Sequence, residues 1–211
     1  MPPLDQVLSA DSGRTLRGRW KMLVVMLVCA APVIASYLTY YLVRPEGRRN
    51  FGELIVPQRA LPDLLVLNLE GQSRPLQLIK GQWLLVSVAP GVCDARCLKN
   101  LYWQRQLRES LGREKDRLDW VWLVNDEAPV SEAMRPGLSD ATVLRMTTQA
   151  IASWLQPADG HGLSEHLYLI DPQGNWMMRF PAELDLAGAA KVKRDLERLL
   201  RASASWDKAG R

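Results

Sequence analysis

Two cysteines separated by three residues, Cys93 and Cys97, are the side chains of this sequence with the clearest chemical potential. An apolar run at residues 83–88 precedes them and predicts a buried strand that ends just before the first cysteine. We expect a helix over residues 97–111, so both sulfurs would lie near a helix N-terminus, where unpaired backbone N–H groups lower thiol pKa values. Such a pair can form a disulfide or hold one soft metal ion.

Two other interpretations fit the same spacing, namely a permanent structural disulfide and a pair of inert core thiols. The strand-to-helix context favours a functional pair, and Arg96, between the cysteines, can add positive potential. Cys29, the third cysteine, lies in an apolar segment and is interpreted as a small apolar filler.

The elements that must position this pair form an α/β pattern with a mixed central sheet. A second buried strand is predicted at residues 118–124, and turn residues separate several shorter strands. The other predicted elements are a hairpin (64–69 and 75–79), strands at 141–146, 166–171 and 176–180, a short helix at 149–155 and a final helix at 184–202. We therefore expect one domain over residues 63–205, followed by a C-terminal tail at 206–211.

The N-terminal part of the chain contains an uncharged apolar segment at residues 22–43, long enough for a helix that crosses a membrane once. A cleaved signal peptide and a buried core helix are the alternatives, but the run is longer than the apolar core of a signal peptide. Residues 1–21 are then an N-terminal tail, and the proline-dotted residues 44–62 are interpreted as a linker.

The basic residues around this segment predict its orientation. Those before it slightly outnumber those after it, which places the tail 1–21 in the cytoplasm. The C-terminal domain would then face the periplasm from a bacterial inner membrane, a compartment in which a cysteine pair can cycle between dithiol and disulfide.

Composition argues against several other classes of function. The net charge is +4, and the basic residues are mixed with acidic ones without an aromatic-interleaved stripe, so nucleic acid is not an expected partner. The sequence contains no glycine-rich phosphate loop, haem-attachment motif or serine nucleophile elbow. The tryptophans and methionines of the predicted strands are interpreted as core packing.

Two motifs carry a resemblance to a known family. GVCDARC after WLLVSVAP, with YLIDPQGN further along the chain, resembles the Sco family of copper-binding cytochrome c oxidase assembly proteins. The resemblance covers most of residues 64–200 and implies a thioredoxin-like fold. GNWMMRFP and RDLERLLRAS are similar, more narrowly, to a proteobacterial set of membrane proteins associated with oxidase assembly.

The resemblance implies that Cys93 and Cys97 bind copper, as Cu(I), together with a histidine. The family is thought to deliver this copper to a cytochrome c oxidase subunit or to reduce the thiols of its copper centre. Leu98 stands where the family usually has a proline, and Leu163 stands at the family's histidine position.

The sequence offers two histidines as the third copper ligand. His161 lies between two glycines in a predicted loop, which lets it move toward the cysteines, so we favour it. His166, the alternative, enters a predicted strand and is held in place there. For each residue a role without metal is the competing interpretation, as a solvated loop residue or as a strand residue hydrogen-bonded to a neighbour.

Three functions remain open at this stage. The first is a membrane-anchored metallochaperone that passes Cu(I) to an oxidase subunit, which is binding rather than catalysis. The second is an extracytoplasmic thiol–disulfide oxidoreductase that keeps client cysteines reduced. The third is a docking module that has kept the fold without either chemistry, and the two cysteines at the strand–helix junction argue against it.

Overall fold

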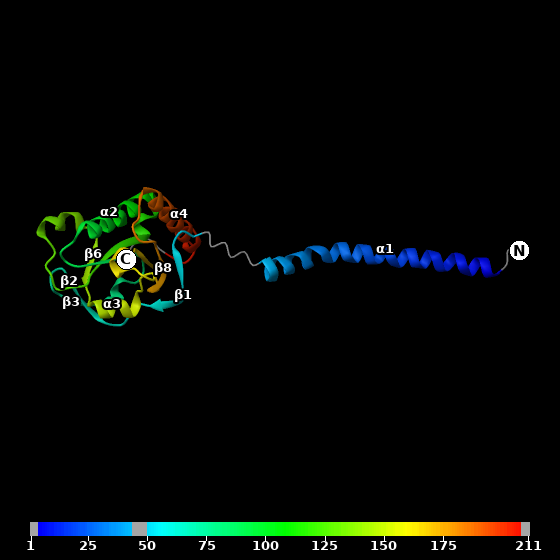
Figure 1. The fold of residues 1–211 in the computed structure, drawn as a ribbon, viewed down its shortest axis with the longest axis horizontal. Helices are drawn as coiled ribbons and strands as arrows, with labels where there is room; N and C mark the ends of the chain where they lie inside the picture. The colour runs from blue at the N-terminus through cyan, green and yellow to red at the C-terminus, as the bar shows by residue number, and fades with distance from the viewer. Residues whose placement is uncertain (1–3, 44–49, 208–211) are drawn as a thin grey trace. The chain divides into compact units, whose positions relative to one another are not determined.

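A computed structural model describes residues 4–43 and 50–207 of the chain, which divides into the compact units Met1–Arg48 and Arg49–Arg211. The first unit contains helix α1 (Leu4–Leu38), which continues as a π-helical turn, η1 (Thr39–Val43) (Figure 1). Helix α1 therefore begins within the predicted tail 1–21 and runs through the predicted membrane segment.

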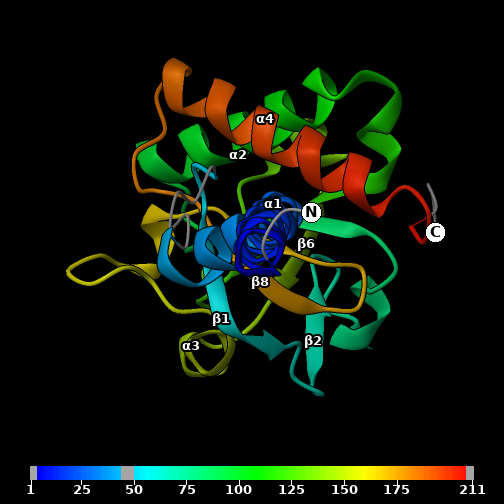
Figure 2. The same cartoon turned by 90° about the vertical axis from the view of Figure 1, so that its right-hand side faces the viewer.

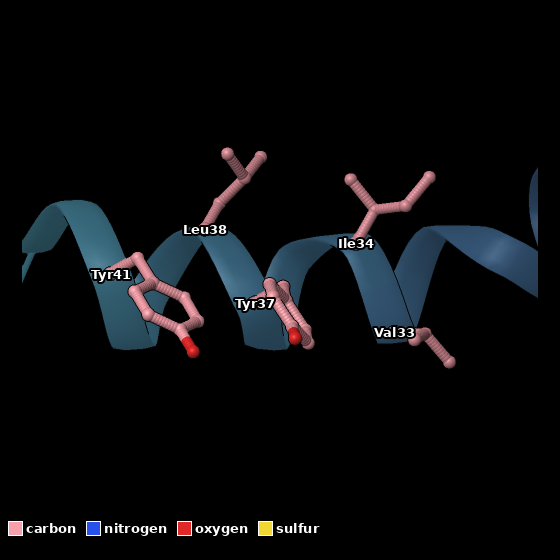
Figure 3. A pocket seen from close by; sticks show the side chains of 5 residues that line it. All are labelled: Val33, Ile34, Tyr37, Leu38 and Tyr41. Atoms are coloured by element: carbon pink, nitrogen blue, oxygen red, sulfur yellow. The ribbon is translucent and has the colours of Figure 1, made fainter.

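The stretch Gly18–Tyr41 has a mean hydropathy of 2.2 and is long and apolar enough to cross a membrane. Its side chains are exposed apart from the partly covered Ala30. Figure 3 shows five of them projecting from the helix, among them Tyr37 and Tyr41, whose ring centroids are 5.0 Å apart. A bare apolar surface of this kind suits contact with lipid acyl chains.

The second unit is built on an eight-stranded mixed sheet with the strand order β1-β8-β7-β4-β5-β6-β2-β3. Strands β4, β5 and β6 run parallel to one another, and the remaining pairs are antiparallel. The strands are β1 (Glu53–Ala60), β2 (Leu65–Asn68), β3 (Ser73–Pro75), β4 (Trp83–Ala89), β5 (Leu118–Val124), β6 (Thr142–Arg145), β7 (Tyr168–Ile170) and β8 (Asn175–Arg179).

Helices cover both faces of this sheet. Figure 2 shows α2 and α4 together on one side and α3 on the other. The helices are α2 (Ala95–Ser110), α3 (Thr148–Trp154) and α4 (Leu186–Ser203), and short 3₁₀ segments are η2 (Leu76–Ile79), η3 (Gly112–Arg117), η4 (Glu132–Leu138) and η5 (Leu163–Glu165). The predicted α/β class with a mixed sheet is confirmed.

Strand β4 lies in the middle of the sheet, and all of its residues are buried. Its alternate side chains enter different cores, because successive residues of a strand point to opposite faces. Leu84 and Val86 pack in the cluster that contains Ile151 of α3, whereas Leu85 packs with Val192 of α4. A continuous apolar run is what a strand covered on both faces requires, so the sequence pattern identified this strand correctly.

The residues predicted as a linker include a strand. Strand β1 pairs antiparallel with β8, so the sheet begins before residue 63. Most of the β1 residues are exposed, and the strand contains Pro57, as an edge strand permits. Strand β1 was not predicted because its residues are mostly polar and include a proline. Backbone pairing with β8 defines this strand more than side-chain burial does.

Two smaller predictions also differ from the structure. The second arm of the predicted hairpin is the short strand β3, and Leu76–Ile79 form η2 instead, with Leu76 and Ile79 buried. The predicted tail 206–211 begins too early, since Asp207 is buried and the rings of Trp83 and Trp206 are 6.3 Å apart.

Asp207 belongs to a buried polar cluster at the amino ends of β4 and β5, which we call the amino-end cluster: Trp83, Arg117, Ser203 and Asp207. Trp83 Nε1 and Arg117 Nη2 each donate a hydrogen bond to Asp207 Oδ2, at a distance of 2.8 Å in both cases. Arg117 Nη2 also donates to Ser203 Oγ at 2.9 Å. These bonds fasten the end of α4 to the sheet.

Candidate redox site

Cys93 and Cys97 are joined by a disulfide at the carboxyl end of β4, with their Cα atoms 5.2 Å apart. Cys97 is the third residue of α2 and is 3% exposed, whereas Cys93 lies in the turn before the helix and is half-buried. The two sulfurs therefore differ in access: a reactant from solvent can approach Cys93 more readily than Cys97.

Helix α2 begins two residues earlier than predicted, because Asp94 caps it. The Asp94 carboxylate accepts a hydrogen bond of 2.8 Å from the backbone N–H of Cys97. An aspartate is a favoured N-cap residue, so the sequence did contain a signal for this boundary. Cys93 consequently lies outside the helix, and the pair bridges the cap instead of sharing a helical turn.

Gln104 holds α2 against the sheet beneath the disulfide. Its side chain is fully buried, and Nε2 donates to the carbonyl oxygens of Leu85 on β4, at 2.7 Å, and Val121 on β5, at 2.9 Å. Ser87 Oγ donates to Gln104 Oε1 at 2.9 Å. The amide is thereby fully engaged with two neighbouring strands, which fixes the height and rotation of α2.

The turn before Cys93 packs against the loop that follows β5. The Gly91 N–H donates to Asp126 Oδ1 at 2.7 Å, and a Cβ at residue 91 would overlap the carbonyl oxygen of Ala128. Arg145 at the end of β6 donates to the carbonyl oxygens of Asp126 and Ala128. Glycine is thus required at position 91 by close backbone approach, which fixes the entry to the cysteine pair.

A charged group beside the pair, which we call the carboxyl-end cluster, consists of Arg96, His161 and Glu165. Arg96 Nη1 lies 3.3 Å from Glu165 Oε1, and His161 Nδ1 lies 2.6 Å from Glu165 Oε2. Asn100 of α2 also donates to the Ser164 carbonyl oxygen at 3.0 Å. The loop with His161 is therefore docked on the helix that carries Cys97.

The same contacts act on the Glu165 carboxyl group. Its pKa is lowered, first by the hydrogen bond from His161, then by the Gly162 N–H and the charge of Arg96. An ionised carboxylate accepts these bonds best. Glu165 thus links a residue between the two cysteines to a histidine on the neighbouring loop.

His166, the alternative ligand, is placed differently. It is 2% exposed, its Nδ1–H donates to the Phe180 carbonyl oxygen at 2.8 Å, and its Nε2 accepts from the Ala158 N–H at 3.2 Å. Burial lowers its pKa. Both ring nitrogens of His166 are thus hydrogen-bonded within the fold.

The donor set fits Cu(I) in part. Reduction of the disulfide would free two adjacent soft sulfur donors, which suit this ion. Within residues 4–43 and 50–207, however, no three His, Cys, Asp or Glu side chains are grouped closely enough to hold a metal ion. His161 lies on the loop that contacts α2, but its Nδ1 is already paired with the Glu165 carboxylate.

Sequence reasoning missed two residues of this site. Glu165 and Asn100 connect the histidine loop with α2, but they are separated by many residues and follow no spacing rule. Arg96 was noticed for its charge, whereas its partner became visible only in three dimensions. Gln104 is a further contributor, a buried amide in a helix that exposes Leu98 and Tyr102, so that its buried face is not evident from the sequence pattern.

Both a family model and solved structures resemble this chain. The family model described as "Transmembrane-like, thioredoxin-like, C-terminal domain" matches residues 83–203, more than half of the chain. No curated protein sequence matches it.

Solved structures share the fold at low identity. Copper-bound ScoI from Arabidopsis thaliana has 13% identity and a TM-score of 0.53, over 67% of this chain and 98% of that one. A SCO1/SenC family lipoprotein from Bacillus anthracis has 18% identity and a TM-score of 0.51, over 69% and 98%. A thiol:disulfide interchange protein from Bacteroides sp. has 17% identity and a TM-score of 0.51, over 70% and 91%. The predicted thioredoxin-like fold is thereby confirmed, with Sco proteins and thiol–disulfide exchange proteins among the neighbours.

Proposed function

Because this chain belongs to the transmembrane-like, thioredoxin-like C-terminal domain family, we propose that it exchanges disulfides with client proteins through Cys93 and Cys97. The observation that carries the proposal is the disulfide itself, which joins a half-buried sulfur before α2 to a buried one within it. Exchange proceeds by thiolate attack on a disulfide, and access decides which sulfur reacts.

The reaction runs in two balanced steps. In the reduced protein the Cys93 thiolate attacks a client disulfide, forms a mixed disulfide and releases one client sulfur, which takes up a proton. The Cys97 thiolate then attacks Cys93, the second client thiol leaves, and the protein retains the disulfide seen here. A dithiol reductant restores the pair by the reverse exchange.

Trapping experiments on the full chain in detergent micelles test these roles. All variants carry Cys29→Ser, so that only the pair reacts. The Cys97→Ser variant should accumulate a mixed disulfide with a small disulfide probe, whereas Cys93→Ser should accumulate far less, because Cys97 is 3% exposed. Mass spectrometry after thiol alkylation should show the loss of two protons when the intact pair is oxidised. Permanently free thiols, or a disulfide that no dithiol reduces, would exclude this function.

We further propose that α1 anchors the protein in a bacterial inner membrane, with the C-terminal domain in the periplasm. The apolar stretch Gly18–Tyr41 supports the anchor, and the basic residues before it support the orientation. A reporter fused after Arg211 should be active only outside the cytoplasm. Activity of a cytoplasmic reporter at that position would show that the C-terminal domain faces the cytoplasm and would contradict the proposed orientation.

A second candidate function is Cu(I) binding and delivery to a client such as a cytochrome c oxidase subunit. The docking of the His161 loop on the helix that carries Cys97 favours it, because a movement of His161 away from Glu165 and toward the pair would add an imidazole to two thiolates. This function requires the reduced pair, whereas exchange uses both redox states.

Anaerobic Cu(I) titration against a competing chelator distinguishes the two functions. Replacing Cys93 or Cys97 by serine should nearly abolish Cu(I) binding, and His161→Ala should weaken it measurably. The His166→Ala variant should act through stability, since both ring nitrogens are already bonded. Wild-type affinity in both histidine variants would remove histidine from the ligand set and leave exchange as the favoured function.

A further inference from the structure

Apolar side chains are exposed immediately around the cysteine pair. Val92, directly before Cys93, is 68% exposed, and Leu98, directly after Cys97, is 51% exposed. Tyr102 is 56% exposed and lies four residues after Leu98, on the same face of α2. Large apolar side chains on a surface are costly when they cluster and often mark a binding site.

The exposed charges on this part of α2 are basic. Arg96 is paired with Glu165, but Lys99 and Arg105 form no salt bridge within the residues that the structure describes. Asp94 is also exposed and negatively charged, and its carboxylate is held at the start of the helix by the Cys97 N–H. The charge of Arg105 acts on Glu109 as well. The surface beside the disulfide therefore combines apolar side chains with basic residues, and of these Lys99 and Arg105 form no salt bridge among the described residues.

Chemistry identifies what covers this surface. When Cys93 forms a mixed disulfide, the partner sulfur is bonded directly to the Cys93 sulfur, so the residues that flank the partner's cysteine must lie against those that flank Cys93. In the client-reducing step, the client segment is the occupant that must approach this face.

We propose that Val92, Leu98, Lys99, Tyr102 and Arg105 form a docking surface that selects client segments in which the reactive cysteine has both apolar and acidic neighbours. The apolar neighbours pack on Leu98 and Tyr102, and the acidic neighbours complement Lys99 and Arg105. This inference rests on the proposed exchange function and adds a client class to it.

Peptide disulfides test the selection with the full chain in detergent micelles. Three single-cysteine peptides are prepared as symmetric disulfides, with leucine and glutamate, leucine and lysine, or serine and glutamate around the cysteine. Each reduced protein molecule converts one peptide disulfide into two peptide thiols and becomes oxidised at Cys93 and Cys97. The peptide with leucine and glutamate should react about tenfold faster than either other peptide at low salt, measured as the second-order rate constant for oxidation of the pre-reduced protein. The charge part of this preference should shrink at high salt.

Substitutions on the surface should change the selection in a defined way. Leu98→Gln should lower the rate with the leucine–glutamate peptide, and Lys99→Glu should shift the preference toward the leucine–lysine peptide. Leu78→Gln is the matched control, because Leu78 is 59% exposed but lies in η2, before the amino end of β4 and away from the cysteines. This control should keep the wild-type preference.

An uncharged small disulfide, 2-hydroxyethyl disulfide, separates the two proposals. Leu98→Gln and Leu78→Gln should reduce it at the wild-type rate, because it is too small to use the docking surface. The rate of Lys99→Glu with this disulfide is the reference for its peptide rates, since the charge change can also act on the thiolates. Equal rates for the three peptides, with normal reduction of the small disulfide, would overturn the docking surface and leave the exchange function intact. Failure to reduce the small disulfide would instead overturn the exchange function itself.

Discussion

Two charged clusters lie toward opposite ends of β4, and they are built in opposite ways. The amino-end cluster joins the end of α4 to the sheet, and the carboxyl-end cluster joins the His161 loop to α2. In the amino-end cluster the side chains of Arg117 and Asp207 are 8% and 0% exposed. In the carboxyl-end cluster those of Arg96 and His161 are 45% and 44% exposed. One cluster is enclosed in the core, and the other meets solvent beside the reactive sulfurs.

The difference in exposure gives the two clusters different contributions to stability. A charge in the core is tolerated only when it is paired, so loss of one partner is costly. Exposed ion pairs contribute little to stability, because water screens them and holding long side chains costs entropy. The amino-end cluster therefore fixes α4 on the sheet, whereas the carboxyl-end cluster can rearrange at little cost in stability.

The largest expected effect is at the amino end. Asp207→Ala should lower the free energy of unfolding by about 3 kcal/mol, because the buried guanidinium of Arg117 loses its buried carboxylate partner and keeps only the exposed Glu114. Denaturant unfolding followed by tryptophan fluorescence measures the change. Glu132→Ala, which removes an exposed partner of Arg135, is the control and should change stability by less than about 0.5 kcal/mol. Similar losses in both variants would erase the proposed contrast.

His166 gives the next largest effect and tests the boundary of the adjustable region. His166→Ala leaves the Phe180 carbonyl oxygen and the Ala158 N–H without their partner and should cost about 1–3 kcal/mol. His161→Ala serves as the comparison and should leave unfolding nearly unchanged, since His161 is exposed. If the two variants are equally stable, the core does not extend to His166.

The pH dependence of stability should report the same residue. Because burial lowers the pKa of His166, the unfolded chain binds a proton that the folded chain refuses as the pH falls below the ordinary histidine value. Stability contributed by neutral His166 is thus complete above the ordinary histidine pKa of about 6.5 and declines as the pH falls below it. His166→Gln should flatten this decline in denaturant titrations at several pH values. An unchanged slope would assign the decline to another group.

The smallest expected effect is at Glu165. Glu165→Gln removes the charge that faces Arg96 and His161 but should leave the unfolding midpoint unchanged within error, because the ion pairs are exposed. Glu165→Lys is the larger perturbation, because it places a second positive charge beside Arg96. A large destabilisation by the neutral variant would show that the carboxyl-end cluster is a support like its counterpart.

Sequence reasoning succeeded where one element carries its own signal. The run at residues 83–88 is apolar throughout because β4 is covered on both faces, and the cysteines follow it directly. The final helix was found from the spacing of residues such as Val192 and Leu196. These features depend on local pattern, which the sequence displays.

The remainder depends on contacts between distant segments. Strand β1 is defined by its hydrogen bonds to β8, and its exposed residues show no apolar alternation. The contact between Arg96 and Glu165 joins a helix to a loop, and nothing local to either residue announces it. His161 was favoured over His166 as a ligand because flanking glycines let its loop move, and the structure leaves His161 exposed and His166 buried, but the engagement of His161 by Glu165 required coordinates.

The buried bond between Ser87 and Gln104 has a consequence for how this domain varies among its relatives. Gln104 Oε1 needs the serine hydroxyl, and Gln104 Nε2 needs the strand carbonyl oxygens of Leu85 and Val121, so neither side chain can be replaced alone without stranding a polar group. The two positions should therefore change together, with an aliphatic residue at 104 accompanied by alanine or valine at 87. Such paired exchanges in an alignment would mark chains that seat the cysteine helix by packing alone.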